Sequence, residues 1–368
     1  MRMKKREKTK NTFAMRTRER RKKIKSAFAI GDIDKIKKGI EYERRISRIR
    51  ILIASILVAS FAVFVVIAAL AILNEGLSSF LAAIYSMNLY YFGLALLAIL
   101  AGYVMRYPKW HLYMQKLKVK IATRANFAIY LSMYSMDITP GRWGRAIVSY
   151  TINKLTGVKF AVTFPAVVAD IFTDFLGFVV ILLATTIFLQ KFVLLSLIIT
   201  LLLLVPFIFI YVRRPFEYIK KKLGRVKRLK SVFEAGDVYF ENNKLMTPDA
   251  YAYSMIYTIP AMFLNGIALF YVMLAFGVPL TIVDIPTVLF IFTSSLLIGM
   301  VTGIPATLGV TDAALIGYLL LFFPTTITVG VASLISIFFR LASVWFVQGF
   351  GSVALLDTMR YWRTAKAK

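Results

Sequence analysis

Long apolar runs separated by short polar segments fill the chain from residue 51 to residue 356. Six of these runs approach or exceed 20 residues, the length that an α-helix needs to cross the ~30 Å hydrocarbon core of a bilayer at ~1.5 Å per residue. They are 51–73, 89–104, 160–189, 192–212, 251–276 and 327–356. The pattern therefore predicts an all-α integral membrane protein with about six spans.

Two further apolar stretches are each interrupted by the same skeleton, Pro-x-x-x-Gly, at Pro140–Gly144 and at Pro305–Gly309. Proline removes a backbone donor and breaks a helix, and glycine permits tight backbone. The limbs on either side are 126–136 and 143–155 at the first break, and 287–301 and 310–323 at the second. Because each limb is too short for a span, we expect two re-entrant helical hairpins; a count of eight spans is the alternative.

Basic residues are concentrated in a few polar segments, which predicts the orientation. Residues 1–50 carry 20 Lys and Arg against six acidic residues, 213–248 carry ten against four, and 106–124 carry six and no acid. The loops 74–88, 190–191 and 277–286 are poor in basic residues. By the positive-inside rule we expect a multi-pass protein of the cell membrane with both termini in the cytoplasm. Each basic cluster adjoins a span and would meet anionic headgroups, so nucleic acid is not an expected partner.

This orientation predicts three parts: a basic cytoplasmic tail (1–50), a transmembrane domain (51–356) with a basic cytoplasmic loop (213–248), and a cytoplasmic tail (357–368). The first hairpin would enter from the cytoplasm and the second from outside, so the two units form an inverted repeat. Repeats of this kind place a substrate site between broken helices near the membrane midplane.

Cysteine is absent and His111 is the one histidine of the sequence. No disulfide, thiolate metal site or cysteine nucleophile is possible, and a lone histidine without a carboxylate cluster does not indicate a metal ligand. We therefore expect no cofactor, no metal, no catalytic residues and no enzymatic activity.

Charged residues beside the breaks and inside the spans are the candidates for function. Arg142 and Arg145 follow the first break, where the free N–H groups of a starting helix also favour an anion. Arginine can grip a phosphate with two hydrogen bonds, and a lipid phosphate is the anion available at that depth. The alternative is that both arginines reach the cytoplasmic headgroups.

Asp170 and Asp174 lie one helical turn apart on the third span, and so share a face. Charges inside spans usually face the protein interior and mark a route for a substrate. The two carboxylates could pair with Arg142, Arg145 or Arg340, or carry a proton; Asp312 and Arg340 form a comparable set in the second half. The candidate substrate-binding residues are Pro140, Gly141, Arg142, Gly144, Arg145, Asp170, Asp174, Pro305, Gly309, Asp312 and Arg340.

Two sets of segments resemble the paired signatures of the lysylphosphatidylglycerol synthase transmembrane family. The first set is Thr139–Gly144, Phe164-Pro165 and Asp170–Asp174, and the second is Leu308–Leu315, Phe339–Leu341 and Trp345. The resemblance covers roughly residues 50–356 and implies a flippase-like helical fold that handles polar lipids. We expect the chain not to be a lysylphosphatidylglycerol synthase itself, since no aminoacyl-transferase domain follows Lys368.

The chain departs from the family pattern in its charges. An acidic residue commonly follows the last glycine of the first motif, where this chain has Arg145. The family's Glu-Arg-x-x-Asp reads Asp170-Ile171-x-x-Asp174 here, and Asp312 stands at the usual glutamate of the second motif. These changes are consistent with a charge swap within one cluster or with a different substrate.

Together these features predict a protein that binds an anionic lipid and moves it between leaflets. The lipid would be a phospholipid or a polyisoprenyl phosphate. One alternative is a membrane subunit that presents lipid to a separate transferase, and another is a proton-coupled transporter of small solutes.

Overall fold

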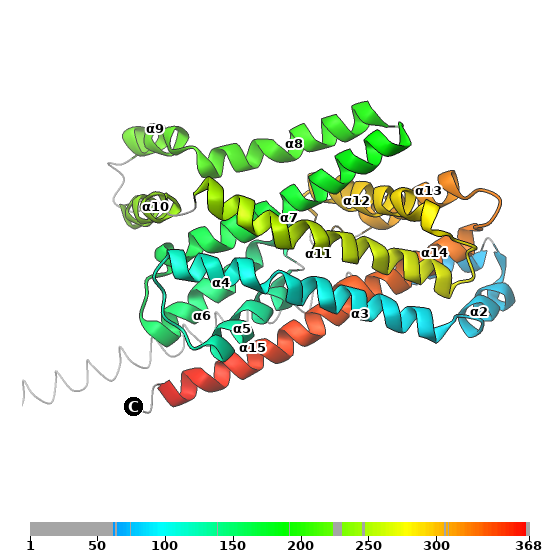
Figure 1. Cartoon of the computed structure of the whole chain (residues 1–368), viewed down its shortest axis with the longest axis horizontal. Helices are drawn as coiled ribbons and strands as arrows, with labels where there is room; N and C mark the ends of the chain where they lie inside the picture. The colour runs from blue at the N-terminus through cyan, green and yellow to red at the C-terminus, as the bar shows by residue number, and fades with distance from the viewer. Residues whose placement is uncertain are drawn as a thin grey trace, which may run out of the picture. The chain divides into compact units, whose positions relative to one another are not determined.

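The apolar runs fold as helices in the computed structural model (Figure 1), and no strand occurs among the residues that it describes. These are residues 62, 65–73, 75–137, 139–190, 192–223, 230–244, 247–304, 307 and 309–365, with some side chains left out. They belong to one unit of the chain, Ser60–Lys368. The predicted tail 1–50, most of the predicted span 51–73, and Pro305 lie outside the described residues. The all-α class is confirmed.

The helices from the first loop to the end of the third span are α2 (Leu77–Tyr85), α3 (Leu89–Met105), α4 (Tyr107–Lys116), α5 (Thr123–Ser132), η1 (Met133–Met136), η2 (Pro140–Ala146), α6 (Ile147–Thr156) and α7 (Phe160–Leu189). Then follow α8 (Val193–Tyr211), α9 (Arg213–Leu223), α10 (Lys230–Asn243), α11 (Pro248–Ala275), η4 (Ile282–Asp284) and α12 (Ile285–Val301). The chain ends with α13 (Val310–Phe322), α14 (Val329–Arg340), the π-helical turn η6 (Leu341–Trp345) and α15 (Phe346–Ala365).

Within the described part of the chain, five helical segments are long and apolar enough to cross a membrane: Leu89–Lys116, Phe160–Leu189, Pro248–Ala275, Ile282–Val301 and Val329–Met359. A sixth would be the pair Val65–Leu73 and Leu77–Tyr85, which is bent by 117°. The protein is therefore a polytopic helical membrane protein.

The two predicted hairpins differ in the lengths of their limbs. Around the first break both helices are short, ten residues each in α5 and α6, as predicted. Around the second break the segment Ile282–Val301 reaches the length of a span, which the prediction of a short limb at 287–301 did not anticipate. The helix starts early because the Asp284 carboxylate accepts the backbone N–H of Thr281 at 2.8 Å and begins a helical turn inside the predicted loop.

The long helix α11 packs most extensively against α3, α7 and α12, and runs beside α3 and α7 in Figure 1. The helices around the first break, α5 and α6, lie at the same end of the bundle as α9 and α10. The helices around the second break, α12 and α13, lie towards the other end, on the side of α14 and α2. The two breaks are thus approached from opposite ends, as an inverted repeat requires, and the repeat itself stays a prediction.

Helix α15 holds the first break in place through a close backbone contact. A Cβ atom on Gly351 would lie 2.6 Å from the backbone nitrogen of Ser135 and 2.9 Å from the carbonyl carbon of Tyr134. Neither backbone atom can move without displacing η1. Gly349 lies two residues earlier on the same helix, and a Cβ there would meet nothing within 4 Å.

We predict that Gly351→Ala lowers and Gly349→Ala raises the thermal stability of the purified protein. Overpacking at Gly351 costs about 1–3 kcal/mol. Alanine at the open position of a helix gains about 0.5–1 kcal/mol over glycine. Thermal unfolding in detergent, followed by tryptophan fluorescence, measures both changes. Shifts of the same sign and size in the two variants would contradict the close contact of α15 with η1.

Candidate functional site

The first break comprises the 3-10 helix η2 and the residues that lead into it from η1, and it is held by its own side chains. Thr139 donates its hydroxyl to the carbonyl of Met136 at 2.9 Å and accepts the backbone N–H of Gly144 at 2.6 Å. A Cβ on Gly144 would lie 2.6 Å from the Met136 carbonyl oxygen, so the turn requires glycine there. Within this turn Arg142 has a φ of 61°, a left-handed conformation that costs a non-glycine residue about 1–2 kcal/mol.

Arg145 is fully buried and is surrounded by carboxylates. Its Nε and Nη2 donate to the two oxygens of Asp137 at 2.5 and 2.9 Å. Its Nη1 donates to Asp170 Oδ2 at 2.6 Å and to Asp174 Oδ2 at 2.9 Å. The guanidinium therefore joins the first break to α7, and it does not line a cavity.

Two cations of the α3–α4 segment complete the cluster. Arg106 donates to Asp174 Oδ2 at 2.9 Å. Lys109 donates to Asp174 Oδ1 at 2.5 Å and lies 3.0 Å from Asp170 Oδ1. All four side chains are essentially buried, with at most 1% of each exposed. A buried charge is tolerated only when it is paired and hydrogen-bonded, so this cluster fixes α3–α4 against α7.

Cations outnumber carboxylates in this cluster. Its members are the four cations Arg106, Lys109, Arg142 and Arg145 and the three carboxylates Asp137, Asp170 and Asp174. Arg142 has the longest ion-pair distances, 3.5 Å to Asp174 and 3.9 Å to Asp137, and its side chain remains 18% exposed. The excess positive charge is thus least compensated at Arg142.

The second break is held by hydrogen bonds from its own helix α13 and from Arg340. Asp312 accepts the backbone N–H of Gly309 at 3.0 Å, which caps the first turn of α13 with the chain's own carboxylate. The same carboxylate accepts Arg340 Nε at 2.5 Å. Arg340 also donates Nη2 to the carbonyl of Thr307 at 3.3 Å, and Thr307 has a φ of 53°. The Asp312 carboxylate therefore occupies the position at the N-terminus of α13 that an external anion would take.

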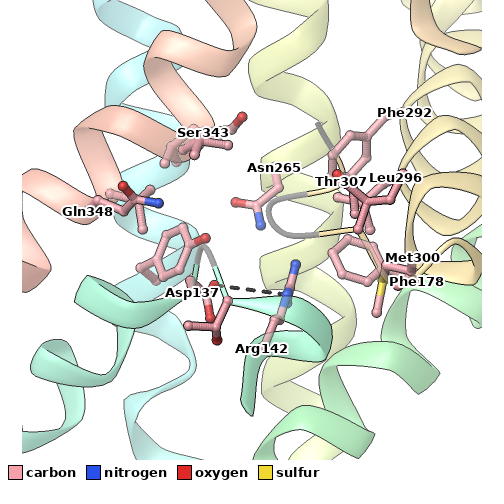
Figure 2. Close-up of a pocket in the computed structure, with 17 residues that line it drawn as sticks. Asp137, Arg142, Phe178, Asn265, Phe292, Leu296, Met300, Thr307, Ser343 and Gln348 are labelled. Atoms are coloured by element: carbon pink, nitrogen blue, oxygen red, sulfur yellow. Dashed lines mark ion pairs between the residues drawn. The ribbon is translucent and has the colours of Figure 1, made fainter. Parts of the chain in front are cut away.

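A cavity of about 140 Å³ lies between the two breaks (Figure 2). Its wall includes Asp137 and Arg142 from the first break and Gly303, Ile304 and Thr307 from the second. The rest of the wall comes from α3, α7, α11, α12, η6 and α15, and is largely apolar. In Figure 2 the Arg142 guanidinium points into this space, with the Asp137 carboxylate beside it.

The structure therefore separates the predicted site residues into groups. Arg142, Arg145, Asp170 and Asp174 come together in one cluster, and of these Arg142 alone is on the cavity wall. Asp312 and Arg340 form a separate pair at the second break. Gly144 and Gly309 shape the two breaks, and Pro140 and Gly141 lie in η2, though their side chains are not described.

Three members of the cluster were not predicted as site residues. We interpreted Arg106 and Lys109 as part of a cytoplasmic basic segment, and assigned no role to Asp137. Their spacing could have indicated that they act together. Arg106 and Lys109 are three residues apart in a helix that continues the span, so both face the same neighbouring helix. Their side chains turn inward because two carboxylates on α7 are within reach there.

The fold and this geometry define a helical membrane protein in which two broken helices meet at a cavity beside a buried charge cluster. The family model of the lysylphosphatidylglycerol synthase TM region matches residues 10–351. The chain belongs to this family, as its signature segments predicted. A search of curated proteins finds no match to the chain.

We predict that Arg145→Leu destabilises the protein far more than Arg142→Leu. Losing Arg145 leaves buried carboxylates without their shared partner, at a cost of about 3–5 kcal/mol. Losing Arg142 removes longer ion pairs from a partly exposed site, at a cost of about 1 kcal/mol or less. Thermal unfolding of both variants in the same detergent measures the difference. Equal losses would show that Arg142 is as much a structural residue as Arg145.

Proposed function

We propose that the protein binds the phosphate of an anionic membrane lipid at Arg142 and moves that lipid between the two leaflets, without enzymatic chemistry. One observation carries this proposal. The buried cluster has one more cation than carboxylates, and its least compensated cation, Arg142, faces a cavity between the two breaks.

The energetics favour an anion at this place. Charges interact more strongly in the low dielectric of a membrane protein than in water, so an uncompensated buried cation attracts a counter-charge. A guanidinium can form two charge-assisted hydrogen bonds to a phosphate. Arg142 is already held by Asp137 and Asp174, and its long ion pairs leave donors for a ligand. Binding of a phosphate therefore replaces the long ion pairs of Arg142 by charge-assisted hydrogen bonds.

The position of the cavity fits movement across the membrane. Sites between broken helices can open to one side and then to the other when the two halves rock against each other. Both breaks contribute a non-glycine residue in the left-handed region to the wall, Arg142 and Thr307. Strained backbone of this kind is often found at binding sites and switching segments. The cavity would take the headgroup while the acyl chains stay in the bilayer.

The contacts of Asp170 and Asp174 favour this proposal over proton-coupled solute transport. Asp170 is engaged by Lys109 and Arg145, and Asp174 by all four cations of the cluster. Both carboxylates therefore act as counter-charges that hold the arginines in position. A membrane subunit that presents lipid to a separate transferase would use the same Arg142 site without moving the lipid. Cytoplasmic termini remain part of the proposal.

We predict that reconstituted protein moves fluorescent phosphatidylethanol faster than fluorescent phosphatidylcholine, and that Arg142→Gln slows this movement about tenfold or more. Phosphatidylethanol carries one phosphodiester charge and a headgroup without further polar atoms, so it isolates the phosphate contact. Loss of a charge-assisted hydrogen bond to that phosphate accounts for the size of the effect. Reduction of outer-leaflet fluorophore by dithionite in proteoliposomes measures the movement.

The matched control is Arg213→Gln, which removes an arginine whose side chain is 43% exposed and paired with Glu217 on α9. It should keep the wild-type rate. No acceleration of phosphatidylethanol over empty vesicles would refute lipid movement. If the protein nevertheless bound that lipid through Arg142, the lipid-presenting subunit would be the better interpretation. Proton flux that depends on Asp174, with no effect on lipid, would favour the transporter.

A further inference from the structure

The cavity contains neutral polar side chains as well as Arg142. Asn265 comes from α11, Ser343 from η6 and Gln348 from α15. Figure 2 shows the amides of Asn265 and Gln348 pointing into the space above Asp137 and Arg142. The wall around these groups is mostly aliphatic and aromatic. Polar groups in such a wall fix what part of a ligand can lie there.

Both amides are buried, and each has one polar atom without a hydrogen-bond partner among the described residues. Asn265 is 6% exposed and Gln348 is 9% exposed. Among the described residues, Asn265 Oδ1 and Gln348 Nε2 have no hydrogen-bond partner. The Nδ2 of Asn265 has only the sulfur of Met262, at 3.8 Å. Buried polar atoms are almost always paired, so an unpaired oxygen and an unpaired nitrogen on one cavity wall point to a ligand that bonds to both.

The helix geometry places Gln348 at this wall. The π-helical turn η6 lies between α14 and α15 and changes the helical register after Arg340. Ser343, Val344, Val347 and Gln348 all line the cavity as a result. Ser343 donates its hydroxyl to the carbonyl of Phe339 at 2.7 Å, which leaves its oxygen able to accept a further bond.

We infer that the lipid carries a hydroxyl-rich headgroup, a polyol or a sugar, esterified to the phosphate that Arg142 holds. This inference rests on the proposed function and specifies its substrate class. A hydroxyl is both donor and acceptor, so it can satisfy the carbonyl oxygen of one amide and the NH₂ of another. The amides belong to different helices, α11 and α15, and a headgroup with several hydroxyls can offer a partner to each.

Amine headgroups do not fit this arrangement. An ammonium can only donate, so it leaves the Gln348 NH₂ unpaired. A choline group offers no hydrogen-bond donor at all. Exchanging the oxygen and nitrogen of the Asn265 amide leaves the argument unchanged, since a hydroxyl can bond to either atom.

The test compares the binding of phosphatidylinositol and of phosphatidylethanol to the purified protein in phosphatidylcholine nanodiscs. The two lipids carry the same phosphodiester charge and differ in the hydroxyls of the headgroup. Two hydrogen bonds of ordinary net strength give wild-type protein a preference of about tenfold for phosphatidylinositol. Native mass spectrometry of the released complexes measures the ratio, with phosphatidylethanolamine as the amine comparison.

In Gln348→Leu and in Asn265→Leu we expect the preference to fall to about threefold, since each substitution removes one amide. Gln115→Leu is the matched control: it makes the same chemical change on an exposed residue of α4 outside the cavity, and should keep the full preference. Asn265 packs against Gly102, so its variant can lose stability. Gln348→Leu keeps the inference testable in that case.

Equal binding of the two lipids by wild-type protein would overturn the inference, because the amides would then bond only water. That result would leave the proposed function standing, since both lipids would still bind through phosphate. If neither lipid bound better than phosphatidylcholine, the proposed function itself would fail. Soluble inositol 1-phosphate provides the last arm: binding of this compound with no binding of the lipid would show that the ligand is not a lipid.

Discussion

The shared carboxylate of Asp174 is the contact on which the rest of this structure depends. Its two oxygens accept hydrogen bonds from Arg106, Lys109 and Arg145, and Arg142 lies 3.5 Å from it. One side chain of α7 thereby holds the α3–α4 segment and the first break at once. A buried charge is costly without its partners, so each of these groups stays where its partners are. The position of Arg142 at the cavity follows from this constraint.

The charged side chains at the two breaks are paired in different ways. The second is largely local: Asp312 caps its own helix at Gly309 and is itself held by Arg340 on α14. The first depends on remote elements, because Arg145 needs Asp170 and Asp174 on α7 as well as the nearby Asp137. The cavity therefore has Arg142 and Asp137 on one side, backed by a buried cluster with one more cation than carboxylates, and neutral side chains on the other. A ligand with an anionic end and a polar, uncharged end matches that asymmetry.

The departures of this chain from its family's charge pattern meet in one place. Arg145 stands where an acidic residue is common, and Ile171 where the third span usually carries arginine. In the structure Arg145 contacts both Asp170 and Asp174, so the first break itself brings the positive charge to the α7 carboxylates. The arrangement is consistent with a charge swap within one cluster. The lysine and arginine of α3–α4 add to this cluster and make it cationic.

The sequence alone determined the all-helical membrane class, the two breaks, the shared face of Asp170 and Asp174, and the family, because hydrophobic run length, proline and helical spacing act over short range. It also grouped Asp312 with Arg340, and the two side chains form an ion pair in the structure. Only the tertiary structure decided that Arg106 and Lys109 turn inward, that Arg145 is enclosed while Arg142 faces the cavity, and that Asn265 and Gln348 share its wall. Basic residues after a span look alike in sequence. Whether they reach lipid headgroups or a buried carboxylate depends on which helix packs beside them, and that is set by contacts between residues more than 60 positions apart, such as Arg106 and Asp174 (|i−j| of 68).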